Sequence, residues 1–332
     1  MPSTALSTES SAGRRLARRL APMFLLLVAS VMATGCTKNE ATGERFLNFM
    51  SPGQEAALGA QAAPQFTAEF GGAVPSPALQ QYVDQIGRRM AAETEAYFPD
   101  VEWEFTLLDS AVVNAFALPG GKVFISRGLA EQLTDESELA GVIGHEIGHV
   151  TAQHAARRIS QSTGFEVGLQ VLASVVGGGA AEPGATSAVA DAIPALQLGG
   201  QVLLLKFGRD QELQADQLGM RYMSRVGYHP SGQLRVMQLL RDLAGGAGGG
   251  GLDIFATHPD PAARVAQIEQ LLATDYRDVA VQGDGRFASR FEQQFLRPLS
   301  QLPPAAHTWV GTGDDGVVAT GMFGWCGTCG GH

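Results

Sequence analysis

The sequence has little positive charge and no long, uninterrupted hydrophobic run. Its 23 lysine and arginine residues face 33 aspartate and glutamate residues, which gives a formal net charge of −10. This balance disfavours nucleic acid as a partner, because a phosphate backbone would be repelled. Apolar stretches at 167–176 and 195–207 are broken by glycine and proline and accompanied by Glu182 and Asp191. We therefore expect mobile helices flanking a cleft rather than an independent membrane span, although a membrane-facing role stays open.

The N-terminus has the composition of an export signal. Four arginines between positions 14 and 19 precede an apolar stretch, Leu20 to Met32, whose 13 residues are too few for a comfortable membrane span. The following Ala33-Thr34-Gly35-Cys36 resembles a bacterial lipobox, which implies removal of residues 1–35 and lipidation of Cys36. Ordinary secretory cleavage is the alternative. With threonine after the cysteine, the lipobox resemblance implies a periplasmic protein anchored to the outer membrane.

A short histidine motif carries the clearest chemical signal. His145-Glu146-Ile147-Gly148-His149 follows the run Thr134-Asp135-Glu136-Ser137-Glu138, which offers a capping residue and first-turn acids, and lies among apolar residues at helical spacing. Histidines at i and i+4 project from one helical face and suit one zinc ion. Glu146 is then placed to take a proton from water at the metal, as in metallopeptidases. The alternative is a core helix with two hydrogen-bonded histidines, but burying these polar groups without a metal would be costly.

Two downstream acids are candidates to complete such a site. Glu212 lies 63 residues beyond His149, and Asp216 is one helical turn further on the same face. Glu212 is the predicted third zinc ligand. Asp216 is predicted to accept a hydrogen bond from the distal ring nitrogen of a zinc-binding histidine and so to fix its tautomer. The alternative is an ordinary solvated acidic face.

Several further sequence blocks accompany the histidine motif. They are Asn114-Ala115-Phe116-Ala117-Leu118-Pro119-Gly120-Gly121, Ser126-Arg127-Gly128-Leu129, the motif helix through His154, Glu212-Leu213-Gln214-Ala215-Asp216, Gly227-Tyr228-His229-Pro230, and Thr257-His258-Pro259-Asp260-Pro261 with Arg264. In order and spacing they resemble one family of zinc metalloendopeptidases of the gluzincin type, which includes HtpX, the CaaX prenyl protease, Oma1 and BepA. The resemblance extends from about residue 47 to about residue 272.

The family resemblance implies an α+β, mainly α-helical fold: a zincin-type metallopeptidase core with a small β-sheet whose edge strand faces the active-site helix. After a signal peptide at 1–35 we expect a linker at 36–52, the metallopeptidase domain at 53–275 and a C-terminal extension at 276–332, partly disordered. Strands are expected at Trp103–Leu108 and Lys122–Ser126. Helices are expected at Gln54–Leu58, Pro77–Thr94, Asp210–Arg225, Ser231–Leu243 and Pro261–Thr274.

Between the expected strands, an extended segment is a candidate for holding substrate. Asn114, Ala115, Phe116 and Ala117 form this substrate-binding edge, which ends in the turn residues Pro119-Gly120-Gly121. An exposed edge can pair with an extended peptide as an added strand and hold its scissile carbonyl at zinc. The alternative is a plain hairpin.

Three further predictions concern individual side chains. By the family resemblance, His258 is a removable fourth zinc ligand that keeps the enzyme latent; its alternative is a structural residue before Pro259. His154, five residues beyond His149, is expected to lie off the ligand face and to be exposed to solvent. Arg221 and Tyr222 are candidate donors to the oxyanion of the transition state.

The C-terminal end carries a second cysteine motif, Cys326-Gly327-Thr328-Cys329, followed by His332. Nothing nearby supplies the framework of a thioredoxin-like redox site. A short disulfide or metal capture remain the alternatives, and no function is assigned to it.

The sequence thus predicts a peptidase with one Zn²⁺ per chain, bound by His145, His149 and Glu212. By the family resemblance its substrates are misfolded or stalled cell-envelope proteins, and envelope assembly machinery is a candidate partner. The alternative is a periplasmic chaperone or assembly factor in which zinc is structural and proteolysis is largely off.

Overall fold

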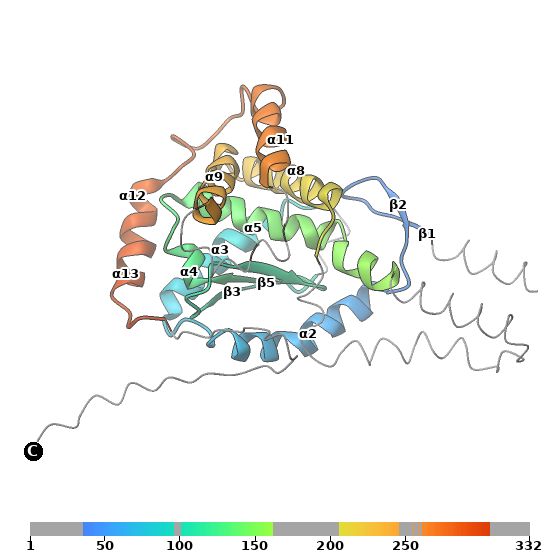
Figure 1. The fold of residues 1–332 in the computed structure, drawn as a ribbon, viewed down its shortest axis with the longest axis horizontal. Coiled ribbons are helices and arrows are strands. Elements are labelled where there is room, and N and C mark those ends of the chain that lie inside the picture. The colour runs from blue at the N-terminus through green and yellow to red at the C-terminus, as the bar shows by residue number, and fades with distance from the viewer. Residues whose placement is uncertain are drawn as a thin grey trace, which may run out of the picture.

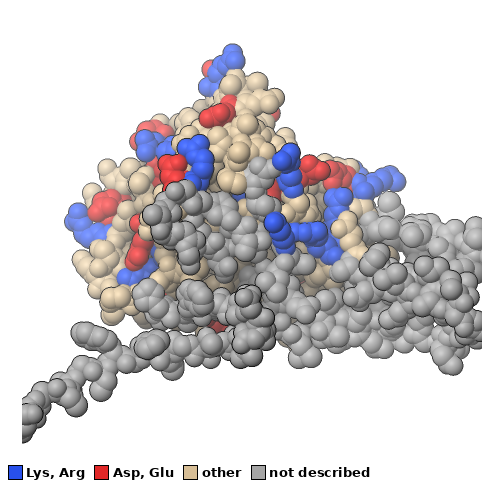
Figure 2. Space-filling model, viewed as in Figure 1, with Lys and Arg blue, Asp and Glu red and all other residues tan. Residues whose placement is uncertain are grey.

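The computed structural model describes residues 36–95, 101–161, 206–245, 254, 258 and 261–305. The predicted signal peptide, the apolar stretches at 167–176 and 195–205, most of the glycine run at 244–251 and the terminal Cys326, Cys329 and His332 lie outside the described residues. Within these ranges, none of the helices combines the length and hydrophobicity needed to cross a membrane. Charged side chains of both signs are interspersed on the face seen in Figure 2.

A small mixed sheet forms one layer of the fold. Its strands are β3 (Glu104–Leu108), β4 (Ala115–Leu118) and β5 (Lys122–Ser126), and β5 lies between the other two. It pairs in parallel with β3 and antiparallel with β4. The β4–β5 turn contains Gly120 and Gly121 at φ values of 75° and 87°, a backbone region that favours glycine. Within the described chain, β4 pairs only with β5 and is an edge strand.

Helices surround this sheet, which confirms the expected mainly helical α+β class. In Figure 1 the sheet lies between α2 and α5, and α8 and α9 lie on the far side of α5. The larger helices are α2 (Pro52–Glu69), α3 (Pro77–Ala91), α5 (Glu136–Thr151), α8 (Arg209–Arg225), α9 (Ser231–Gly245) and α11 (Pro261–Ala273). Short helical turns are α4 (Arg127–Ala130), α12 (Ala288–Phe291), η2 (Glu292–Leu296) and α13 (Arg297–Ser300).

Helix α5 is buried along its whole length. It begins at the cap Asp135, whose side chain accepts a hydrogen bond from the Glu138 backbone N–H at 3.1 Å. The acidic residues Glu136 and Glu138 in the first turn interact favourably with the partial positive charge of the helix N-terminus. Helix α5 contacts the sheet on one side and α8 and α9 on the other, so all of its residues are buried.

Glycines allow α5 and α8 to approach closely. A Cβ added to Gly144 would meet the Gly219 backbone at 3.0 Å, and one added to Gly148 would meet Ala215 O at 2.7 Å. A Cβ at Gly219 would in turn meet the backbone N of His145 at 2.8 Å. The two helices can therefore pack with nearly touching backbones, which brings the acids of α8 against the histidines of α5.

Both ends of the described chain join this core. Residues 36–52, for which a linker is expected, contain a hairpin of β1 (Cys36–Lys38) and β2 (Arg45–Leu47). From its turn, Asn39 Nδ2 donates to the Thr151 carbonyl at the end of α5, at 2.8 Å. In the C-terminal extension, Phe291, Phe295 and Leu299 are fully buried in the main hydrophobic cluster.

Candidate metal centre

Helices α5 and α8 bring four potential metal ligands into one buried cluster. His145 and His149 from α5, Glu212 from α8 and His258 each offer a ligand atom, and these atoms lie within 4.8 Å of one another. His145 Nε2 is 3.0 Å from His149 Nε2, 3.3 Å from His258 Nδ1 and 3.4 Å from Glu212 Oε2. Each of the four residues is at most 5% exposed.

The donor chemistry of this cluster fits a zinc ion. Asp216 Oδ1 lies 2.8 Å from His145 Nδ1, so this nitrogen donates, and Nε2, which faces the nitrogen of His149, is the atom available to bind a metal. Without a metal, a proton on His145 Nε2 bridges to the lone pair of His149 Nε2, and a zinc ion would displace this proton and be held by both nitrogens and the carboxylate. Two buried atoms beside them, His258 Nε2 and Glu146 Oε2, have no hydrogen-bond partner. Such orphaned atoms call for a ligand, and an imidazole–carboxylate set suits zinc.

A charged network supports His145 from behind. Arg264 donates to both oxygens of Asp216 at 2.7 Å, and Gln233 Nε2 donates to Asp216 Oδ1 at 2.6 Å. Burial alone would raise the pKa of Asp216, but Arg264 and His145 hold it well below its usual range. Burial and Arg264 oppose protonation of His145, yet Asp216 and Glu212 outweigh them and raise its pKa to about 9. A carboxylate partner of this kind orients a ligand histidine and increases its basicity.

The two carboxylates beside the histidines have opposite electrostatic character. Burial raises the pKa of Glu146, and the nearby His258 and His145 only partly offset this effect. For Glu212, His258 and Arg264 outweigh burial and hold its pKa well below the usual range. Glu212 therefore has the character of an anionic ligand, and Glu146 that of a group able to accept and release a proton.

Comparison with known protein families gives the same assignment. Residues 77–272, more than half of the chain, match the model of peptidase family M48. The chain belongs to peptidase family M48. This confirms the family predicted from the sequence blocks.

Individual M48 relatives are more distant. The chain is 31% identical over 175 residues to the mitochondrial metalloendopeptidase OMA1 of Arabidopsis thaliana, covering 53% of this chain and 33% of the relative. It is 29% identical over 199 residues to OMA1 of Schizosaccharomyces pombe, covering 58% and 52%. It is 26% identical over 277 residues to the beta-barrel assembly-enhancing protease of Escherichia coli K12, covering 82% and 54%. The matches thus span about a third to a half of these relatives.

The prediction that His154 is exposed is wrong for this M48 member. The side chain is fully buried, with Nδ1 2.9 Å from His149 Nδ1 and Nε2 3.0 Å from Gln214 Oε1. The reason is the backbone between the two histidines: α5 ends at Thr151, and Gln153 adopts a left-handed φ of 54°. The chain therefore turns, and His154 comes back against His149 instead of following the helical rotation.

The candidate oxyanion donors are engaged elsewhere. The Tyr222 hydroxyl contacts Glu95 Oε2 at 2.6 Å and Thr151 Oγ1 at 3.0 Å. Arg221 Nη1 donates to the Ala41 carbonyl at 3.3 Å and to Glu95 at 3.2 Å. Neither contact includes a member of the metal cluster, so the structure gives no support to an oxyanion role for either residue.

Some residues of the centre received no role from the sequence. Arg264 occurred only as part of a family block, yet its guanidinium lies between Glu212 and Asp216, with Nη1 2.9 Å from Glu212 Oε2. Gln233 gave no sequence signal, since a glutamine on an amphipathic helix usually faces solvent. The Gly144/Gly148 spacing, four residues apart on α5, was a signal that could have indicated the close approach of α8.

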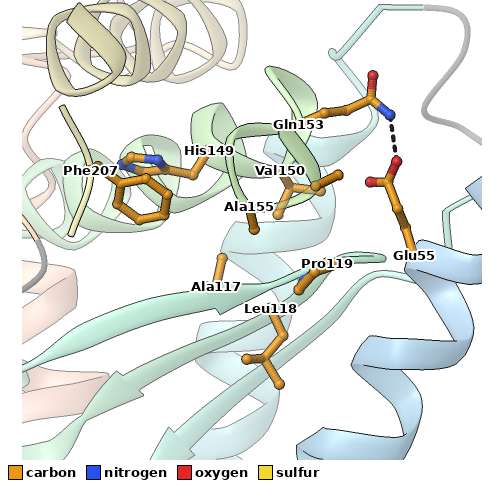
Figure 3. Close-up of a pocket in the computed structure, with 10 residues that line it drawn as sticks. Glu55, Ala117, Leu118, Pro119, His149, Val150, Gln153, Ala155 and Phe207 are labelled. Atoms are coloured by element: carbon orange, nitrogen blue, oxygen red, sulfur yellow. Dashed lines mark hydrogen bonds between the residues drawn. The ribbon is translucent and has the colours of Figure 1, made fainter. Parts of the chain in front are cut away.

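A small pocket connects the centre with the predicted substrate-binding edge. Ala117, Leu118 and Pro119 line one wall, and His149 with Phe207 lines another (Figure 3). At the other side of the pocket Gln153 Nε2 donates to Glu55 Oε1 at 2.7 Å. Burial raises the pKa of Glu55 to about 7, against the hydrogen bonds from Asn48 and Gln153. The end of β4 thus lies beside a candidate metal ligand.

Proposed function

We propose that this protein is a zinc-dependent endopeptidase whose metal is held by His145, His149 and Glu212. The observation that carries the proposal is that these buried ligand atoms lie close together. Next to them are buried polar atoms without a hydrogen-bond partner, one of which belongs to Glu146. When bound, zinc supplies Lewis acidity that polarises the carbonyl of a peptide bond. A site that served structure alone would have no need of the unpaired carboxylate.

In the proposed mechanism, Glu146 moves the proton. Its carboxylate accepts a proton from the attacking water and delivers it to the amine of the leaving peptide. The raised pKa of Glu146 suits both steps, because the group must hold the proton briefly before releasing it. Asp216, held by Arg264, keeps His145 in the tautomer whose Nε2 faces the metal position.

The substrate is proposed to bind along the substrate-binding edge. The backbone of Asn114 is already hydrogen-bonded to Ser126. The Asn114 N–H donates to Ser126 Oγ, and the Ser126 N–H donates to the Asn114 carbonyl, both at 3.0 Å. The side-chain Oδ1 of Asn114, in contrast, is buried without a hydrogen-bond partner. An extended peptide would instead pair with the backbone of β4, which among the described residues is bonded only to β5.

His258 is proposed to keep the enzyme latent. Its Nδ1 lies 3.0 Å from Glu212 Oε1, and its Nε2 lies 3.8 Å from Glu146 Oε1. The ring therefore stands between a metal ligand and the general base, where the attacking water has to be. Displacement of the His258 ring would expose both groups together.

The biological setting is proposed from the N-terminus and the relatives. The predicted export signal and lipidated Cys36 support a periplasmic protein anchored to the outer membrane. One relative carries the name beta-barrel assembly-enhancing protease, which supports misfolded or stalled envelope proteins as substrates and envelope assembly machinery as a partner. The second candidate is a chaperone or assembly factor, favoured by the edge of β4, which pairs only with β5 among the described residues, and by the position of His258.

Cleavage of casein tests the proposal. Three zinc-loaded full-length proteins are compared: the unmodified protein, His258→Ala, and His258→Ala combined with Glu146→Gln. We expect cleavage by His258→Ala that exceeds the unmodified rate and disappears in the double variant. One bound zinc per chain without any cleavage would reject the peptidase and favour the chaperone.

A further inference from the structure

His154 is a buried histidine to which the proposed chemistry assigns no role. Its side chain is 0% exposed, and both ring nitrogens have partners. Nδ1 lies 2.9 Å from Nδ1 of His149, and Nε2 lies 3.0 Å from Oε1 of Gln214 on α8. The contact with His149 is on the side of that ring that faces away from the metal cluster.

The hydrogen positions in this chain of groups follow from its outer end. An amide oxygen only accepts, so His154 Nε2 carries the hydrogen and donates to Gln214. A neutral imidazole protonated on Nε2 has its lone pair on Nδ1, which accepts from the Nδ1–H of His149. His149 then keeps its own lone pair on Nε2, the nitrogen that lies 3.0 Å from His145 Nε2 in the cluster.

We infer that His154 is a positioning residue that holds His149 in its metal-binding tautomer and orientation. The inference rests on the proposed zinc site and extends it. The two histidines of α5 are then supported by different chemistry: an anionic carboxylate behind His145 and a neutral imidazole behind His149. Outer partners of ligand histidines typically contribute about 10- to 100-fold in metal affinity.

The turn that places His154 is itself held in position. Gln153 takes the left-handed conformation between the two histidines, and its amide donates to Glu55 at 2.7 Å. Asn39 Nδ2 lies 3.3 Å from the other end of the same amide. Phe207 also contacts His149, with ring centroids 4.1 Å apart, but it has no acceptor for the Nδ1 hydrogen.

Two substitutions of His154 distinguish a positioning role from a packing role. His154→Asn places an acceptor oxygen where Nδ1 lies but loses much of the ring volume, and His154→Phe keeps the volume but has no acceptor. Gln214→Met, at a half-buried position, removes the outer acceptor without disturbing His154 directly. Zinc dissociation constants of these full-length variants are measured by competition with a chelator, with Co²⁺ absorption spectra as a report of ligand geometry.

We expect His154→Phe to bind zinc about 10- to 100-fold more weakly with an altered Co²⁺ spectrum, and His154→Asn to stay within about threefold of the unmodified protein. Gln214→Met should bind a few-fold more weakly. Tight zinc binding by His154→Phe would overturn the inference while leaving the proposed function intact. Equal weakening in both His154 variants with no effect of Gln214→Met would also overturn it. Absence of zinc binding by the unmodified protein would overturn both.

Discussion

Buried acidic residues in the first turn of helix α5 and in its C-terminal half differ in their hydrogen-bond partners. At the first turn, Arg235 Nη2 and Arg286 Nε contact Asp135 Oδ2 at 2.8 and 2.7 Å. Glu136 accepts from the hydroxyls of Tyr82 and Tyr228 and from Arg290. Almost three turns further on, Glu146 is equally buried, at 2% exposed, but its Oε2 has no hydrogen-bond partner.

This contrast separates structure from function along a single helix. A buried charge that is fully paired contributes to a defined fold, and removing one partner is costly. A buried charge left without a partner destabilises the folded state unless a ligand or a reaction requires it. Glu136 and Glu146 lie on the same helix and are equally buried. The unpaired oxygen of Glu146, and not its burial, therefore identifies the candidate centre.

The largest difference between the two ends should appear in catalysis. Glu146→Gln should lower kcat by about 10²- to 10⁴-fold, because the proton acceptor is lost. Glu136→Gln should leave kcat per folded molecule nearly unchanged. Peptide hydrolysis by zinc-loaded proteins checks this, with bound zinc counted in each sample. An inactive but folded and zinc-loaded Glu136→Gln protein would contradict the division.

Stability should respond in the opposite order. Glu136→Gln should lower the free energy of unfolding by about 3 kcal/mol, because Arg290 loses its partner and the two tyrosines lose a charged acceptor. Glu44→Gln, which removes an exposed ion pair with Arg157, is the matched control and should change it by less than about 1 kcal/mol. Urea unfolding measures both. Equal effects of the two substitutions would show that the first-turn network is not structural.

A smaller effect of opposite sign is expected for Glu146→Gln in the zinc-free protein. Burial raises the folded-state pKa of Glu146, so the carboxyl makes folding less favourable once the unfolded chain ionises. At neutral pH the substitution should therefore increase the free energy of unfolding. Below the ordinary glutamate pKa, where both states are protonated, the gain should disappear. Unfolding curves at pH 4 and pH 7.5 check this, and a loss of stability at neutral pH would contradict it.

Local sequence patterns predicted most of the larger elements, because helix and strand periodicity is a property of neighbouring residues, but the helix expected at Gln54–Leu58 extends over Pro52–Glu69 in the structure. The strand Lys122–Ser126 was predicted with its observed bounds, and Asp210–Arg225 differs from α8 by one residue. The proximity of His145 and His149 could be predicted because both lie on one helix. Predicting Glu212 as a ligand required the weak E-x-x-x-D spacing and the family resemblance, since its contact with the histidines joins two helices.

The remaining features depend on contacts that periodicity does not encode. His154 was misplaced because one left-handed residue, Gln153, redirects the chain. The central position of β5 in the sheet, and the parallel pairing of β3 with β5, follow from how the chain crosses over. Arg264 and Gln233 acquire their roles only when α9 and α11 pack beside Asp216.

Zinc-dependent stabilisation tests the central claim most directly. Thermal unfolding with and without a chelator, together with bound zinc per chain, would be measured for the unmodified protein, Glu212→Gln and Glu136→Gln. We predict one zinc and a raised Tm in the unmodified protein and in Glu136→Gln, with both lost or strongly reduced in Glu212→Gln. Undiminished zinc binding and stabilisation in Glu212→Gln would contradict the assignment of the metal centre.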